Sequence, residues 1–195
     1  SDDIAGLGVG GLLTEIATRP QPRKADAPRI AAVLLAAGSS TRMGGINKMT
    51  ATIGGKPLVR IAAEAALASS VVSLTVVTGH DSGAVRAALA GLDVAFVQND
   101  DHAQGLSTSV RAGIAAVPDD IDGAIVLLGD MPDVSAATID RLIGAFGADR
   151  IVVPTYDGQR GNPVVWPRSR FPDLAALKGD RGGRAILDAN PGAVT

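Results

Sequence analysis

The sequence predicts an α/β fold in which a mostly parallel central sheet is covered by helices on both faces. Short runs made only of apolar residues recur along the chain, as expected for strands that are buried on both sides. Amphipathic stretches separate these runs, and this alternation is typical of a parallel sheet. Because ligands bind at the carboxyl ends of such strands, the loops that follow the strands are the candidate binding segments.

The regular pattern begins near residue 29, and the chain before it is different. Residues 1–28 are rich in glycine and then in proline, which is typical of a linker or tail. This segment is either a plain tail or the end of an upstream domain, and residues 29–195 form the predicted domain. Strands are predicted at 30–36, 73–78, 94–97, 123–128, 151–154 and 163–166. Helices are predicted at 57–69, from 81 or 82, at 107–116, after a cap at Ser135, and from 181 or 182 to 189.

Composition and charge exclude several classes of protein. The chain has no cysteine, so it has no disulfide, thiolate metal site or cysteine nucleophile. Aromatic residues make up 3% and the net charge is -2, which argues against a nucleic-acid-binding surface. No apolar run reaches the ~18 residues of a membrane span, and the acidic start Ser1-Asp2-Asp3 lacks the features of a signal peptide. We therefore expect a cytoplasmic protein that binds neither nucleic acid nor membrane.

A glycine-rich loop follows the first predicted strand. It reads Ala36-Ala37-Gly38-Ser39-Ser40-Thr41-Arg42-Met43-Gly44, and Lys48 comes four residues later. Glycines let backbone amides approach an anion closely, and the two cations suit phosphate oxygens. The loop is not a Walker A motif, because Lys48 is followed by Met49. A dinucleotide-type glycine pattern at 6–11 has no strand before it, so its required context is missing. The sequence predicts a phosphate site at 36–48, with a mobile turn and two solvated cations as the alternative.

An acidic residue follows the fourth predicted strand. Asp130 comes directly after Leu127-Leu128-Gly129, and Asp133 follows three residues later. Asp130 could cap the next helix, but Ser135 stands closer to it and is the better cap. Mg²⁺ prefers one or two carboxylates together with water and substrate phosphates. We therefore predict that Asp130 binds a metal, and we interpret Asp133 as a surface or turn residue.

Two histidines also follow predicted strands. Neither His80 nor His102 has an obvious acid or serine partner in the sequence. We interpret both as loop or surface histidines rather than as catalysts.

These motifs together resemble a known family. The segment 34–44 with Lys48 resembles the signature of the MobA-like nucleotidyltransferases, and Leu128-Gly129-Asp130-Met131-Pro132 resembles their metal loop. Three further segments are similar to the branch that contains molybdenum cofactor cytidylyltransferase: 104–114, 160–164 and 179–184. Gly182-Gly183 departs from the Gly-Ala of many relatives. The resemblance covers about residues 30–190.

The resemblance implies a three-layer, Rossmann-like nucleotidyltransferase fold, Mg²⁺ as cofactor, and CTP and a molybdopterin-type cofactor as partners. The Ala36-Ala37-Gly38 start resembles the form linked with cytidine users. The implied catalytic residues are Arg42, Lys48 and Asp130. The implied nucleotide contacts are Leu35, Ala36, Ala37, Gly38, Ser39, Ser40, Thr41, Arg42, Gly44, Lys48, Thr78, Gly79, Gly105 and Ser107. The implied acceptor contacts are Arg160, Asn162, Asp180 and Arg184, with Asn162 or Asp180 as a second ligand of the metal at Asp130.

The predicted function is transfer of CMP from CTP to the terminal phosphate of the molybdopterin-type cofactor. Three alternatives remain open: guanylyl or other nucleotidyl transfer to molybdopterin or a sugar phosphate, a nicotinamide-dependent oxidoreductase of the same family, and a nucleotide sensor without turnover. Arg19-Pro20-Gln21-Pro22-Arg23 resembles the junction to a fused upstream molybdopterin-binding domain. Such a domain, or a molybdoenzyme that accepts the product, is the implied protein partner.

Overall fold

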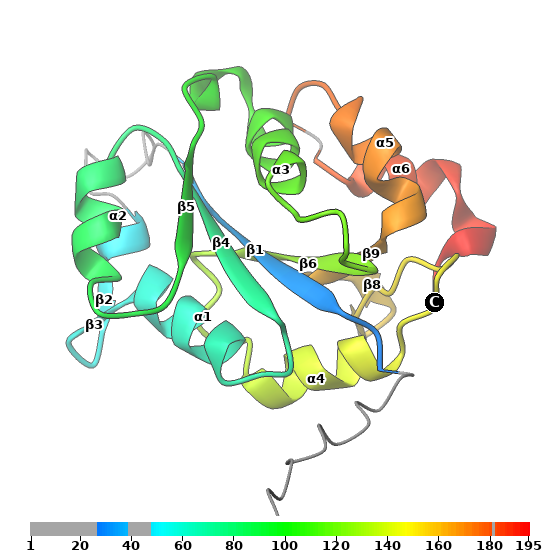
Figure 1. Ribbon diagram of the computed structural model, residues 1–195, viewed down its shortest axis with the longest axis horizontal. Helices are drawn as coiled ribbons and strands as arrows, with labels where there is room; N and C mark the ends of the chain where they lie inside the picture. Colours follow the sequence, from blue (N-terminus) through cyan, green and yellow to red (C-terminus); the bar gives the residue numbers. More distant parts are fainter. Residues whose placement is uncertain (1–26, 39–47, 181) are drawn as a thin grey trace, which may run out of the picture.

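The central sheet of this protein has five strands. The computed structural model describes residues 27–38, 48–180 and 182–195. Four strands run parallel, and the last lies antiparallel at one edge, in the order β5-β4-β1-β6-β9 (Figure 1). Their bounds are β1 (Ile30–Ala36), β4 (Ser73–Thr78), β5 (Ala95–Gln98), β6 (Gly123–Leu128) and β9 (Val164–Pro167). The mostly parallel sheet predicted from the sequence is confirmed.

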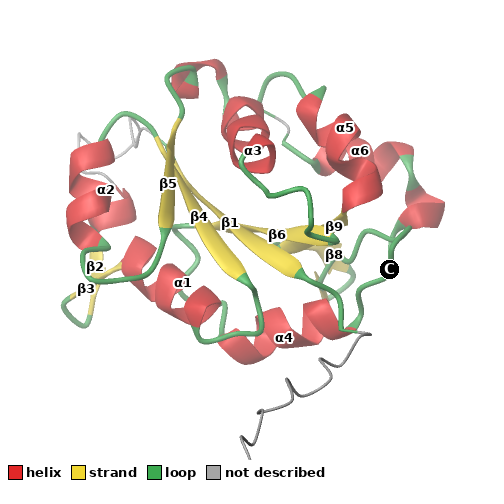
Figure 2. Cartoon of the chain, viewed as in Figure 1, coloured by secondary structure: helices red, strands yellow, loops and turns green. Residues whose placement is uncertain are grey.

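Helices cover both faces of this sheet (Figure 2). One layer contains α1 (Leu58–Leu67), α2 (Ser82–Ala88) and α4 (Ala136–Gly144). The other contains α3 (Leu106–Ala115), α5 (Phe171–Ala175) and α6 (Arg184–Ala189). The connecting segments and the C-terminal end contain short 3-10 helices: η2 (Lys48–Thr50), η3 (His102–Gln104), η4 (Arg168–Arg170) and η5 (Pro191–Ala193). The three-layer arrangement is therefore confirmed.

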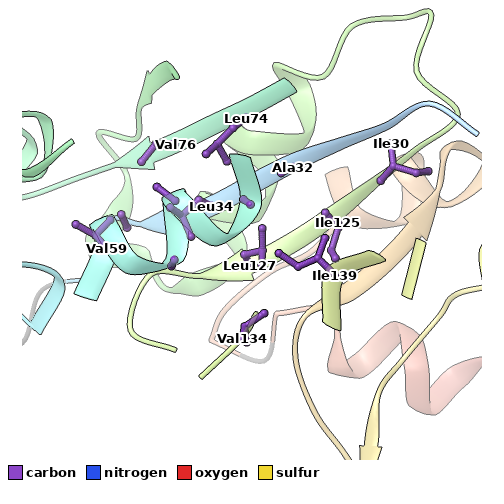
Figure 3. Packing of buried hydrophobic residues seen from close by; sticks show 14 of the residues in the cluster. Ile30, Ala32, Leu34, Val59, Leu74, Val76, Ile125, Leu127, Val134 and Ile139 are labelled. Atoms are coloured by element: carbon purple, nitrogen blue, oxygen red, sulfur yellow. The ribbon is translucent and has the colours of Figure 1, made fainter. Parts of the chain in front are cut away.

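Strand β1 separates two hydrophobic cores. All seven of its residues are buried, and successive side chains point to opposite faces of the sheet. Ala32 and Leu34 belong to the core beneath α1 and α4, which Figure 3 shows from close by. Val33 and Leu35 belong to the core beneath α3, α5 and α6. Burial on both sides explains why this strand reads as an unbroken apolar run.

Several element boundaries differ from the prediction. In the predicted strand 151–154, Ile151 and Val152 form single bridges to Val194 and Val165 rather than a strand. Pro57 precedes α1 instead of opening it, because it pairs in a hairpin of β2 (Thr52–Ile53) and β3 (Lys56–Pro57). The last helix begins only at Arg184, since Gly182 has a φ of +50° that no α-helix contains. A second hairpin, β7 (Thr155–Tyr156) with β8 (Gln159–Arg160), was not predicted.

Little of the N-terminal segment lies within the described residues. Of the predicted linker or tail at 1–28, the structure describes only Ala27 and Pro28. Among the helices in the described ranges, none has the length and apolar character to cross a bilayer.

Two carboxyl groups have a lowered pKa, and neither belongs to the predicted site. A hydrogen bond from Lys56 lowers the pKa of Glu64, with a further contribution from Arg60. A hydrogen bond from Arg29 lowers the pKa of Asp120 in the same way. Arg29 precedes β1 and Asp120 precedes β6, so this ion pair lies at the amino edge of the sheet, opposite the predicted site.

Close packing of α3 on the sheet leads to a stability prediction. A β-carbon at Gly113 would collide with Val33 and lie 3.0 Å from a methyl group of Val77. Both valines are fully buried, so neither can move aside easily. We expect Gly113→Ala to lower the free energy of unfolding by about 1–3 kcal/mol, as overpacking does. Denaturant titration measures this value.

The matched control for this prediction is Gly144→Ala at the end of α4. A β-carbon there would have no neighbour within 4 Å, so the change should be neutral or stabilise the protein by up to about 1 kcal/mol. Equal stability of the two variants would contradict the close contact between α3 and the sheet.

Candidate active site

The carboxyl ends of four parallel strands meet at one edge of the sheet. Ala36 at the end of β1 pairs with Thr78 at the end of β4, and Thr78 pairs with Gln98 at the end of β5. On the other side, Leu35 pairs with Leu128 at the end of β6. The register therefore brings the glycine-rich loop, the turn after β4 and the loop that carries Asp130 to the same edge. The sequence had predicted these loops separately, without their order across the sheet.

The start of the glycine-rich loop packs against the turn after β4. Ala37 is buried and Gly38 is exposed. A β-carbon at Gly79 would lie 2.7 Å from the carbonyl oxygen of Ala37, so only glycine allows the two loops to approach this closely. The predicted contacts Ser39, Ser40, Thr41, Arg42 and Gly44 lie outside the described residues.

Met49 holds the segment that carries Lys48 against the predicted metal loop. Lys48 is exposed and begins the 3-10 helix η2, whereas Met49 is buried. A β-carbon at Gly129 would lie 2.8 Å from the sulfur of Met49, and one at Gly38 would lie 3.9 Å from its methyl group. Met49 is thus wedged between the start of the glycine-rich loop and the residue before Asp130. The backbone next to Lys48 is held between the two predicted catalytic loops.

Asp130 fits the chemistry of a divalent metal ligand. Its neighbour Gly129 donates its backbone N–H to Leu35 at 3.0 Å, which fixes the loop to the end of β1. The carboxylate is partly exposed, and no hydrogen bond or ion pair engages it within the described residues. The described ranges contain no cluster of three or more His, Cys, Asp or Glu side chains that could hold a metal. A site here would therefore use few carboxylates and depend on water and substrate oxygens, which is the coordination that Mg²⁺ prefers.

Further predicted site residues lie at the end of β4 and around the start of α3: Thr78, Gly105, Ser107 and Asp180. Thr78 is fully buried, and its hydroxyl donates to Gln98 at 3.0 Å, so its side chain braces the strand end. Ser107 is also buried, and its backbone N–H donates to Gly179 at 3.2 Å. Gly105 has a φ of +110° and lies directly against the Asp180 carboxylate. Asp180 therefore packs against the start of α3, on the predicted nucleotide side.

The predicted acceptor residues Arg160, Asn162 and Arg184 line one cavity of about 750 Å³. Leu35 and Leu128 also line it, so the cavity adjoins the ends of β1 and β6. The antiparallel direction of β9 brings residues 160–162 to this edge, because the amino end of β9 lies beside the carboxyl end of β6. Asp180 does not line the cavity. Whether Asn162 or Asp180 is a second metal ligand remains a prediction.

Most of the cavity wall was not predicted from the sequence. Apolar side chains from both α3 and the late helices form it, together with the carboxylate of Asp188. Asp188 lies 3.6 Å from the Arg160 guanidinium in an exposed ion pair. The ring of Trp166 is buried and packs directly on Gly183, where a β-carbon would collide with it. The apolar lining residues are Leu35, Leu106, Val110, Val126, Leu128, Val164, Trp166, Leu174 and Leu187.

Comparison with known proteins agrees with this geometry. The family model described as "MobA-like NTP transferase domain" matches residues 32–194, which includes every described site residue. The chain belongs to the MobA-like NTP transferase family. The reaction class of this family is nucleotidyl transfer, so the enzyme class predicted from the sequence is confirmed.

Curated relatives of this MobA-like chain differ in their printed activities. Bifunctional protein GlmU of Kineococcus radiotolerans is 36% identical over 141 residues, which cover 71% of this chain but 29% of GlmU. Nicotine blue oxidoreductase of Paenarthrobacter nicotinovorans is 32% identical over 174 residues, which cover 85% of each chain. The chain therefore spans less than a third of the GlmU relative, and most of the oxidoreductase.

Solved structures have the same fold. Rv0371c from Mycobacterium tuberculosis H37Rv superposes with a TM-score of 0.75 and 31% identity, covering 83% of each chain. The nucleotidyl transferase Mth528 from Methanothermobacter superposes with a TM-score of 0.75 and 26% identity over 85% of each chain. A CMP-2-keto-3-deoxy-manno-octonic acid synthetase complexed with CTP has a TM-score of 0.65 at 16% identity, which shows a shared fold alone.

Proposed function

We propose that this protein transfers CMP from CTP, with Mg²⁺, to the terminal phosphate of a molybdopterin-type cofactor and releases pyrophosphate. The observation that carries this proposal is the cavity beside the β1 and β6 ends. Apolar side chains that include Trp166 line it, and Arg160 and Arg184 contribute positive charge. A flat heterocycle with a phosphate tail has the matching chemistry, and about 750 Å³ lies within the usual range for small-ligand sites.

The reaction needs one part of the site to hold the acceptor and another to hold the triphosphate of CTP. A terminal phosphate oxygen of the acceptor attacks the α-phosphorus of CTP, and the bond from that phosphorus to the bridging oxygen of pyrophosphate breaks. No general base is required, because the attacking phosphate is already ionised. Arg160 and Arg184 hold the acceptor, and the loop from Ala36 to Lys48 holds the triphosphate. Catalysis then depends on alignment and charge neutralisation.

Asp130 is the residue that would hold the metal ion. A divalent cation neutralises charge on the triphosphate and the leaving pyrophosphate when it is bound. A structure of Rv0371c, 29% identical to this chain with a TM-score of 0.71, is a complex with manganese. That likeness supports a divalent metal, and Mg²⁺ is the ion we propose here.

The direct test supplies purified protein with Mg²⁺, CTP and molybdopterin and measures pyrophosphate and the CMP-linked product. We expect product with CTP in preference to GTP, ATP or UTP. Product with GTP alone would favour guanylyl transfer, and product with a sugar phosphate would replace the acceptor. Nucleotide binding without any product would favour the sensor alternative.

Arg184, which lines the cavity, is predicted to bind the acceptor substrate. Arg184→Ala should raise the acceptor KM by roughly 10- to 100-fold, because a hydrogen bond to a charged group contributes about 1.5–3 kcal/mol. The dissociation constant for CTP should stay unchanged. Steady-state kinetics and nucleotide titration measure the two effects separately.

Arg141→Ala is the control for this variant, since it removes the same charge from exposed α4 on the opposite face of the sheet. If Arg184→Ala and Arg141→Ala have the same acceptor KM, the cavity is not the acceptor site.

A nicotinamide-dependent oxidoreductase is the second candidate. It is favoured by the match to nicotine blue oxidoreductase, which covers 85% of each chain. A thermal-shift panel of CTP, GTP, ATP, UTP and NADH, with and without Mg²⁺, separates the two candidates. Stabilisation by CTP with Mg²⁺ supports nucleotidyl transfer, and stabilisation by NADH alone overturns it.

Cellular context follows from the same proposal. The reaction uses cytoplasmic substrates, so we place the protein in the cytoplasm. We propose that residues 29–195 are the catalytic domain and that residues 1–28 form a tail or the junction to a molybdopterin-binding domain. That domain, or a molybdoenzyme that receives the product, is the proposed protein partner.

A further inference from the structure

Asn99 holds together the segment between β5 and α3. It is 5% exposed, and its side-chain amide donates to the hydroxyls of Thr108 and Ser109, each at 2.9 Å. Its side-chain oxygen accepts the backbone N–H of Asp101 at 3.1 Å. With all of these groups hydrogen-bonded, the short η3 helix is held firmly against the start of α3. His102 is the first residue of η3.

The same segment fixes the ring of His102. Its Nδ1 lies 3.2 Å from the backbone carbonyl oxygen of Asn99. A carbonyl oxygen only accepts hydrogen bonds, so Nδ1 must carry the proton and donate it. In the neutral imidazole, Nε2 is then an acceptor. Within the described residues no hydrogen bond to Nε2 is formed, and the nearest ring is that of His80, with 6.0 Å between centroids.

His102 lies among the predicted nucleotide contacts. A β-carbon at Gly79 would lie 2.9 Å from Cβ of His102 and 2.7 Å from the Ala37 carbonyl oxygen. Ala37, Gly79 and the β-carbon of His102 are therefore packed against one another. Along the chain, Gly105 and Ser107 follow His102 closely. The partly buried imidazole thus lies between two sets of residues that are predicted to surround the nucleotide.

We propose that His102 determines base selectivity by accepting a hydrogen bond from an exocyclic amino group of the base through Nε2. Cytosine offers such an N–H donor at its 4-position, whereas uracil offers a carbonyl acceptor there. With uracil, Nε2 of His102 would face the 4-carbonyl oxygen, and both are hydrogen-bond acceptors. Both groups would then stay unpaired, which disfavours the uracil base. The selectivity comes from the fixed tautomer of His102. This inference rests on the proposed use of CTP and names the residue that reads its base.

The test is a double cycle between His102 and the 4-amino group. Dissociation constants are measured with Mg²⁺ for CTP and for the CTP analogue that lacks the 4-amino group, in the wild type and in His102→Leu. In the wild type, we expect the analogue to bind about tenfold more weakly, the factor for one net hydrogen bond. In His102→Leu, the two ligands should bind alike. UTP should be the weakest ligand of the wild type.

Two further variants keep the test decisive. His80→Leu removes the neighbouring exposed ring and should retain the tenfold preference. His102→Gln keeps a polar side chain of similar reach, so it serves if the leucine variant does not fold. Glutamine can both donate and accept, so it should bring the CTP and UTP affinities together.

The outcomes separate this inference from the proposed function. If His102→Leu keeps the wild-type preference for CTP over the analogue, His102 does not read the base, although cytidylyl transfer stands. If the wild type binds no CTP, both the inference and the proposed function are overturned. A preference that disappears only in the His102 variants supports the inference.

Discussion

Replacing Asp130 with alanine is expected to abolish Mg²⁺-dependent nucleotide binding and to lower nucleotidyl transfer by about 10³-fold. Asp130 follows β6 at the edge where the ends of β1 and β4 also lie, and its carboxylate has no partner among the described residues. A metal ion that neutralises phosphate charge contributes several kcal/mol, and about 4 kcal/mol corresponds to this factor in rate. Nucleotide titration with and without Mg²⁺ and single-turnover kinetics measure the two effects.

Asp133→Ala is the matched control for this variant. Asp133 is exposed and lies three residues further along the same loop, and its replacement removes the same charge. We expect it to retain Mg²⁺-dependent binding and near wild-type turnover. If Asp130→Ala keeps its response to Mg²⁺, the metal is held elsewhere and the metal loop has been misidentified.

The parts of the fold that sequence predicts best are those with strong local patterns. The runs of β1 and β6 are apolar throughout because both faces of the strand are covered, and a pattern of this kind needs no knowledge of the neighbours. Ser135 was identified as a helix cap from its position alone, and its side chain accepts the backbone N–H of Thr138. The loops that follow these strands could therefore be placed at one edge before the structure was known.

The parts that sequence could not predict lack a pattern of residue types. The β2–β3 and β7–β8 hairpins are each two residues per strand, too short for a periodic pattern. Trp166 was predicted only as a strand residue, and its place in the cavity depends on α6 packing across it through Gly183. His102 had no partner in the sequence, because its partner is a backbone carbonyl. Short hairpins and contacts to the backbone leave no signature in residue types, and the packing of Gly183 on Trp166 joins segments that are separated along the chain.

The sequence predicts Lys48 as a catalytic residue, and the structure shows how the backbone around it is held. The lysine is exposed at the start of η2, and buried Met49 anchors that helix between Gly38 and Gly129. The backbone carbonyl of Lys48 accepts the N–H of Ala51 at 3.1 Å, and Ala51 in turn accepts the N–H of Leu58 at 2.8 Å. The start of α1 therefore supports the segment that carries the charge. A lysine held in this way can neutralise a phosphate with little reorganisation.

We expect Lys48→Ala to lower turnover by roughly 10²–10³-fold, the range for losing one well-placed electrostatic contact in the transition state. The protein should still fold, because the side chain is exposed and the anchoring Met49 is unchanged. Lys56→Ala is the control: it removes the same charge, and the ion pair that Lys56 forms with Glu64 is exposed to solvent and contributes little to stability. Comparing kcat of both folded variants with the wild type shows whether the charge of Lys48 contributes to turnover. A Lys48→Ala enzyme as fast as the Lys56→Ala enzyme would mean that the positive charge at 48 does not act on the phosphates.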